Sequence, residues 1–169
     1  MKNRILMLIA LTLLALGLCA CARADVVFSE VMASTATFVG QRHDDWVELH
    51  NTGGKAVSLS GCYLSNDPYN LRRWAFPDTA KIAKGGYLVV YCAGEPVTNG
   101  QSGALYTDFK ISAKGDELYL TDPQGNTQTL AFGAQFGTVS YGVPAGGDTW
   151  LYLETATPGK ANGKNGYAA

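Results

Sequence analysis

The 169-residue chain is poor in charge and in the side chains on which most metal and catalytic sites are built. Asp, Glu, Lys and Arg supply 16% of the residues, the formal net charge is −1, and there are two histidines and four cysteines. Binding to nucleic acid calls for a basic face or stripe, which so few and so balanced charges do not provide. We therefore expect no nucleic-acid partner, no metal and no cofactor.

The sequence also lacks helical periodicity and the usual catalytic patterns. After the N-terminal stretch, no window of a dozen residues keeps a helical spacing of apolar residues free of glycine and proline, of which the chain has 20 and 6. No glycine-rich loop opens onto a helix, which argues against phosphate binding. No H-E-x-x-H, C-x-x-C or G-x-S-x-G pattern is present, and we expect no enzyme.

The N-terminus has the pattern of an export signal. Lys2 and Arg4 precede an uncharged apolar run over residues 5–18, which is shorter than the roughly 20 residues that span a membrane. LCAC, residues 18–21, resembles a bacterial lipobox and predicts cleavage before a lipidated Cys21, which would hold the protein at a membrane. ARA, residues 22–24, offers a second cleavage site that would release a soluble chain. The lipobox follows the apolar run directly, and we favour it.

The rest of the chain predicts β-strands, because short runs with period-two alternation are separated by turn-forming segments such as NTGG, NDPYN and PAGGD. Many short strands at close spacing are typical of an all-β sandwich or barrel. We expect a signal peptide of the lipoprotein type at 1–20, a short linker at 21–25, one β-sandwich domain at 26–162 and a flexible tail at 163–169. The expected strands are residues 26–32, 46–50, 56–60, 62–66, 71–76, 86–92, 117–122, 127–133, 138–143 and 150–154.

The segment DDWVELHN, residues 44–51, gathers acidic side chains and a histidine, and so raises the possibility of a metal site. As a strand it turns Val47 and Leu49 towards the core, while Trp46, Glu48 and His50 share the other face. We expect that face to be open to solvent, with charges that contribute little to the stability of the fold. The alternative is a metal-dependent hydrolase built on this strand.

Other polar and aromatic residues also leave alternatives open. The oxygen-rich turns SNDPYN (65–70) and TDPQGN (121–126) suit calcium, but Asx-Pro sequences form turns without it, and we favour turns. Cys62 and Cys92 are either a disulfide, as suits an exported protein, or two buried thiols. Six aromatic residues are candidates for surface binding, although each more often fills a core: Tyr69, Trp74, Tyr106, Tyr141, Trp150 and Tyr152.

Several motifs in a fixed order resemble the lamin tail domain, in particular its bacterial exported branch. The most specific are DWVELHNTG, LSGCYLSND, GGYLVVY and the closing TPGKAN, and the resemblance runs from about residue 26 to 162. It implies an immunoglobulin-like β-sandwich without established catalytic residues. Many bacterial members carry an aromatic where this chain has Cys62, and a bridge to Cys92 would take over its packing role.

The sequence as a whole predicts a non-catalytic, exported binding or anchoring module at the bacterial cell envelope. Its partner would be an unidentified protein or glycan, and its only membrane contact a lipid on Cys21. Two alternatives remain: a metal-dependent hydrolase or nuclease accessory domain, and a structural partner that joins an envelope assembly by strand addition at an open sheet edge.

Overall fold

The computed structural model describes residues 25–35, 43–95, 97, 103–137 and 139–168. The expected signal peptide and Cys21 lie outside this part of the chain. Every regular element within it is a strand, and no helix long and apolar enough to cross a membrane occurs there. The strands are β1 Val26–Met32, β2 Asp45–Asn51, β3 Val57–Ser58, β4 Tyr63–Ser65, β5 Trp74–Ala75, β6 Lys81–Ile82, β7 Tyr87–Cys92, β8 Leu105–Tyr106, β9 Asp116–Thr121, β10 Thr127–Phe132, β11 Ser140–Gly142, β12 Leu151–Leu153 and β13 Gly166–Tyr167.

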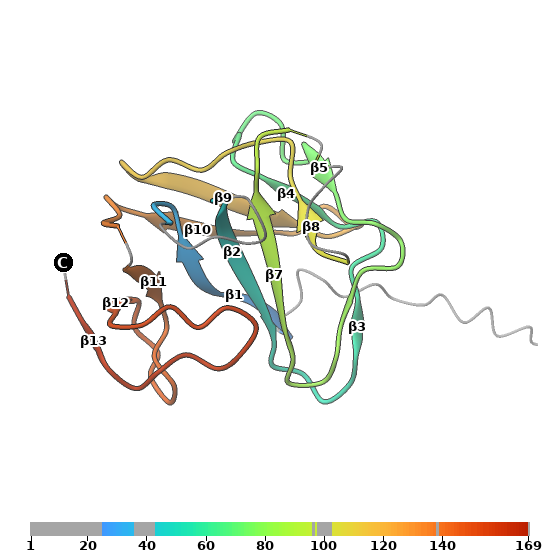
Figure 1. The fold of residues 1–169 in the computed structure, drawn as a ribbon. Helices are drawn as coiled ribbons and strands as arrows, with labels where there is room; N and C mark the ends of the chain where they lie inside the picture. Colours follow the sequence, from blue (N-terminus) through green and yellow to red (C-terminus); the bar gives the residue numbers. More distant parts are fainter. Residues whose placement is uncertain (1–24, 36–42, 96, 98–102, 138, 169) are drawn as a thin grey trace, which may run out of the picture.

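Two larger sheets form the fold (Figure 1). The first has the order β13-β12-β11-β1-β2-β7-β8 and the second the order β10-β9-β4-β5, with β3 and β6 as a separate pair. Among the described strands, only β7 and β8 pair in parallel. The buried apolar cluster draws on strands of both sheets, which therefore face each other across one core. The core residues on these strands include Val31, Val47, Leu49 and Val90 of the first sheet and Leu64, Leu118, Leu120 and Leu130 of the second.

This arrangement confirms the expected all-β, immunoglobulin-like sandwich. The long strands coincide with the predicted ones to within two residues at either end, because alternation over six or seven residues is a clear signal. The sequence did not predict β6, β8 or β13, each of which has only two residues.

The segment expected to be a flexible tail, residues 163–169, includes the two-residue strand β13. Gly166 and Tyr167 pair with Leu153 and Tyr152 of β12 and extend the first sheet. The chain reaches this edge because Asn162, just before it, is buried and hydrogen-bonded to backbone carbonyls. A segment rich in Gly, Asn and Lys is thus ordered by contacts that its own composition does not reveal.

A β-bulge in β1 sets the position of the residues discussed next. The pairing of β1 with β2 shifts between Phe28 and Glu30, which leaves Ser29 as the extra residue. Phe28 and Val31 can therefore both face the core, although they are three residues apart. Glu30 consequently lies on the opposite face of the sheet, beside Glu48.

Candidate functional site

Two glutamates lie buried side by side on the outer face of the first sheet. Glu30 of β1 and Glu48 of β2 are direct cross-strand partners, and both are 0% exposed. Like charges at such a position repel each other, and burial of an ionised carboxylate costs free energy unless hydrogen bonds satisfy it. The pair therefore depends on what covers it.

The cover is an irregular segment close to the C-terminus, residues 154–162, which we call the strap. Figure 1 shows the C-terminal part of the chain, in red, beside β1 and β2. The backbone N–H of Thr157 donates to both carboxyl oxygens of Glu30, at 3.1 and 3.2 Å. The backbone N–H of Gly159 donates to Glu48 at 2.6 Å. The strap thus brings donors from the far end of the sequence to both carboxyls.

Hydroxyl groups complete the coordination of the two carboxyls. The Ser140 hydroxyl of β11 and the Thr157 hydroxyl contact Glu30 at 2.5 and 3.0 Å. The Ser29 hydroxyl at the bulge donates to Glu48 at 2.6 Å. No lysine or arginine side chain is among the contacts of either carboxyl in the described structure. Within the described part of the chain, the donors to this pair are therefore neutral.

Two glycines allow the strap to approach the sheet. Gly142 of β11 has no room for a side chain, because a Cβ there would lie 2.7 Å from the Ser29 carbonyl oxygen and 2.9 Å from Nδ2 of Asn162. Gly159 has a φ of 83°, a left-handed conformation that glycine adopts without strain, and in it the N–H meets Glu48. The closing motif TPGKAN therefore has a structural purpose.

Burial raises the pKa of both carboxyls. It is the largest influence on Glu48, whose pKa rises to about 7; the hydrogen bonds from Ser29 and Gly159 lower this pKa, and the charge of Glu30 raises it. The pKa of Glu30 is also raised, by burial, against the opposing effect of the hydrogen bonds from the Ser140 hydroxyl and the Thr157 backbone N–H. The site therefore holds protons more strongly than exposed carboxyls do.

The expectation that Trp46, Glu48 and His50 form a solvated face is wrong. Trp46 is buried and Glu48 fully so, because the outer face is covered. His50 is half-buried and stacks on Tyr87 of β7 with ring centroids 4.2 Å apart, and burial lowers its pKa. The inward direction of Val47 and Leu49 is as expected, since both are fully buried in the core.

The residues considered for metal or hydrolytic chemistry are not brought together. Among the described residues, no group of three or more His, Cys, Asp or Glu side chains is placed to hold a metal. The carboxylate of Asp122 accepts from the backbone and side chain of Asn126, and that of Asp67 accepts from the Tyr69 N–H, so both Asx-Pro turns are closed by their own hydrogen bonds. Ser140 is buried and donates to Glu30.

The proposed disulfide between Cys62 and Cys92 is also corrected. Cys92, at the end of β7, is a free, buried thiol. Burial raises the pKa of the Cys92 thiol well above its usual range, so it is a core side chain of low reactivity.

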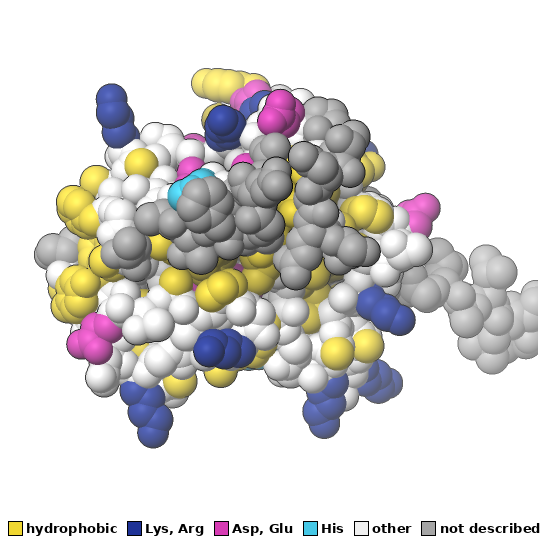
Figure 2. All heavy atoms as spheres, viewed as in Figure 1, with side chains coloured by type: hydrophobic (Ala, Val, Ile, Leu, Met, Phe, Trp, Pro, Cys, Tyr) yellow, Lys and Arg dark blue, Asp and Glu magenta, His cyan; other side chains and the backbone are white. Residues whose placement is uncertain are grey.

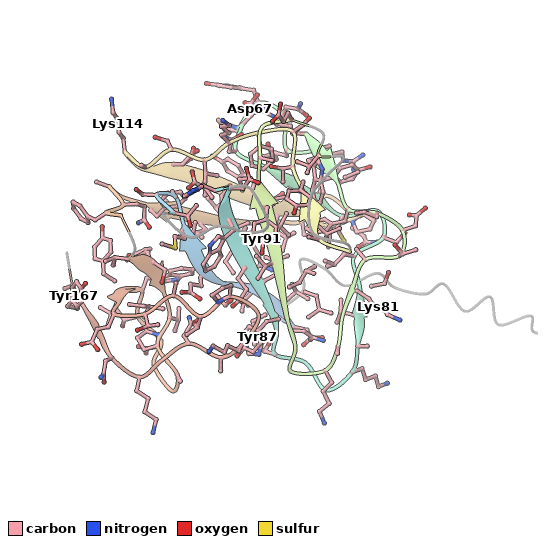
Figure 3. All side chains as sticks on the ribbon, in the orientation of Figure 1. Asp67, Lys81, Tyr87, Tyr91, Lys114 and Tyr167 are labelled. Atoms are coloured by element: carbon pink, nitrogen blue, oxygen red, sulfur yellow. The ribbon has the colours of Figure 1, made fainter. Side chains whose placement is uncertain are left out.

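A shallow groove lies beside the carboxyl pair. It has a volume of about 380 Å³ and runs between the His50–Tyr87 stack and residues 143–147, with Ala161 and Asn162 of the strap on its wall. Figure 3 labels Tyr87 and Tyr91, which come from the same strand at this face of the sheet. The strap therefore both covers the carboxyls and shapes the groove.

One of the six aromatic candidates is almost fully exposed to solvent. Tyr69 is 97% exposed, whereas Tyr152 is buried and the other four are partly buried. Its turn is fixed internally: the Ser65 hydroxyl accepts from the Asp67 N–H at 2.9 Å and donates to the Asn70 carbonyl at 2.7 Å. Figure 3 shows Asp67 of this turn at the outer edge of the molecule.

The base of the same turn is tied to a neighbouring loop. Asn66 donates to the Lys110 carbonyl at 3.1 Å and to the Asp116 carboxylate at 3.3 Å. Arg73 donates to the Asn66 side chain at 2.9 Å and pairs with Asp108 at 3.6 Å. The exposed tyrosine is thus presented by a preformed turn.

A comparison with known protein families matches residues 20–135 to the lamin tail domain. The match covers more than half of the chain. This protein belongs to the lamin tail domain family. The family's immunoglobulin-like fold agrees with the observed sandwich, and the family is not in general catalytic. No curated protein matches the sequence.

The matched region of the lamin tail domain ends before the strap. Glu30 and Glu48 lie inside it, whereas Thr157, Gly159 and Asn162 lie beyond it. The sequence did contain a signal for their contact, since TPGKAN stood out as a motif together with DWVELHNTG. Nothing in the sequence indicated that these two motifs contact each other.

Proposed function

We propose that this lamin tail domain is an exported, lipid-anchored binding module of the cell envelope, and that the turn carrying Tyr69 is its contact surface. The family supports an immunoglobulin-like domain without catalytic chemistry. The apolar run before LCAC supports export and lipidation at Cys21. The observation that carries the proposal is the nearly complete exposure of Tyr69 on a turn held by its own hydrogen bonds.

An exposed tyrosine on a rigid turn suits recognition of a partner. Tyrosine contributes a large amphipathic surface at low cost in side-chain entropy, and it is enriched among the residues that dominate binding energy. A turn that is already ordered loses little further freedom on binding. On the face shown in Figure 2, Lys and Arg side chains are dispersed rather than gathered, which favours a contact based on shape and aromatic surface over one based on charge.

Contact at Tyr69 is tested by photo-cross-linking in cells that produce the full chain. A photo-reactive phenylalanine analogue is placed at position 69, or at Lys114 as the exposed control on another loop. We expect a discrete cross-linked product from position 69 only. Tyr69→Ala should abolish co-purification of the captured partner, while Tyr167→Ala, which alters another exposed aromatic, should not. Equal capture from both positions would contradict the proposal.

Anchoring is tested separately by fractionation of cells that express Cys21→Ala. Because the lipid is attached to Cys21 in this proposal, the variant should move from the membrane fraction to the soluble fraction. Mass spectrometry of the native N-terminus should show a lipidated Cys21. A mature chain that begins at an unmodified Asp25 would refute anchoring and leave the contact surface untouched.

A further inference from the structure

We propose that the strap is a latch held closed by a proton on Glu30, and that it opens when this proton is lost. The proposal concerns a regulated state of the domain and does not depend on the binding role of Tyr69. It rests on a count of hydrogen atoms around the Thr157 hydroxyl.

The first step fixes the orientation of the Asn162 side chain. Its amide nitrogen contacts two carbonyl oxygens, those of Ser29 at 2.9 Å and Val143 at 2.8 Å. Carbonyl oxygens only accept hydrogen bonds, so the atom that faces both must be the NH₂ group. The other amide atom, Oδ1, is therefore an acceptor and points to Thr157.

The second step counts hydrogens at Thr157. Its hydroxyl oxygen lies 2.9 Å from the Asn162 Oδ1 and 3.0 Å from the Glu30 Oε2. A hydroxyl has one hydrogen to donate. With Glu30 ionised, one of the two short contacts would join two oxygen atoms with no hydrogen between them. A proton on Glu30 Oε2 completes the chain, because Glu30 donates to Thr157 and Thr157 donates to Asn162.

The surroundings favour the neutral form of Glu30. Its direct neighbour across the strands is the carboxyl of Glu48, and the groups contributed by β11 and the strap are the neutral Ser140 and Thr157. Along β2 the next titratable residue is His50, stacked on Tyr87 of β7, and the titratable residues of the strap, Lys160 and Glu154, are exposed. Burial raises the pKa of Glu30, in agreement with the hydrogen count.

Loss of the proton would release the strap from β1. The Thr157 hydroxyl would then serve either the Glu30 carboxylate or Asn162, and two buried carboxylates would face each other. Asn162 and Ala161 form part of the groove wall beside His50. Opening of the latch would therefore widen the groove and uncover the outer face of β1 and β2.

The protonation state is measured directly on the wild-type domain. Carbon-13 NMR of the glutamate carboxyl carbons should show Glu30 titrating well above the usual range of a glutamate carboxyl, which is centred at about 4.3 in model peptides. Titration of Glu30 within that usual range would overturn the proposal. This measurement needs no variant.

Opening is measured by amide hydrogen exchange between pH 6 and pH 9, corrected for the intrinsic dependence on pH. Protection of the Thr157 and Gly159 amides should fall by at least about tenfold, while that of Leu118 and Leu130 in the β9–β10 hairpin stays unchanged. Glu30→Gln places a permanent donor at the position of Oε2, and should keep the latch closed at pH 9. Glu154→Gln, an exposed change in the same segment, should behave as the wild type.

Three further results would overturn the latch. One is protection of the Thr157 amide that does not depend on pH in the wild type, and another is loss of that protection at pH 9 in Glu30→Gln. If Glu30→Gln does not fold, Thr157→Val replaces it, since this variant removes the hydroxyl that requires the proton. The carboxyl of Glu30 should then titrate at a lower pH than in the wild type, and no change in its titration is the third contrary result.

Discussion

Glu48 and Glu154 are chemically identical residues in opposite situations. Glu48 is fully buried and bonded to Ser29 and Gly159, whereas Glu154 is exposed at the start of the strap. A buried donor that loses its acceptor keeps the full penalty of its desolvation, while an exposed group turns to water. The consequences of substitution follow from this difference.

Glu48→Ala should lower the free energy of unfolding by about 2–4 kcal/mol, because the Ser29 hydroxyl and the Gly159 N–H lose their acceptor beside a new cavity. His50→Ala should cost about 1 kcal/mol, the scale of its stacking on Tyr87. Glu154→Ala should stay within about 0.5 kcal/mol. Urea denaturation at pH 6 measures all three. A Glu48→Ala variant as stable as Glu154→Ala would show that the buried contacts contribute nothing.

Among the elements, β2 shows what the sequence can and cannot predict. Its alternation correctly placed Val47 and Leu49 in the core, because a period of two separates two faces. The alternation did not indicate whether either face of β2 is exposed to solvent. β2 is a central strand between β1 and β7, and the strap covers its second face from 111 residues away.

The buried pair escaped prediction for a related reason. The strap has no regular secondary structure and hence no periodicity. It reaches both carboxyls through backbone N–H groups, which every residue but proline carries. The bulge at Ser29 was equally invisible, although it decides that Glu30 faces outward. The long strands of the lamin tail domain could be predicted from local pattern, whereas the candidate site arises from non-local contacts.

The strands and strap beyond the family match are expected to be essential to the fold. A chain of residues 25–135 lacks β11–β13 and leaves both glutamates without their cover. It should show no cooperative thermal transition by circular dichroism, whereas residues 25–164, which lack only the two-residue β13, should melt cooperatively. Melting of the 25–135 chain at the temperature of the full domain would show that the strap is dispensable.

For the whole molecule, the shifted carboxyls link stability to pH. Burial raises the pKa of Glu30 and Asp45, and raises that of Glu48 to about 7. Between the usual pKa and the raised one, the folded state keeps a proton that the unfolded chain releases, so this contribution is complete at low pH and is lost as the pH rises. The lowered pKa of His50 acts in the opposite direction near pH 6.

The free energy of unfolding should therefore fall from pH 5 to pH 8. Glu48 alone accounts for up to about 3 kcal/mol, from the shift of its pKa to about 7. Urea denaturation at the two pH values measures the difference, and Glu48→Gln, which does not titrate, should reduce it. A domain that is equally stable or more stable at pH 8 would contradict the prediction.

The distance along the chain between the glutamates and their cover has a consequence for synthesis. Thr157 is 127 residues from Glu30, so the outer face of β1 and β2 cannot close until nearly the whole polypeptide has been made. Until then both carboxyls are hydrated and ionised, and the unfinished sheet displays two negative charges. Charges on an open sheet discourage association with other nascent chains. Before they are buried, the two glutamates would thus protect the unfinished domain against aggregation.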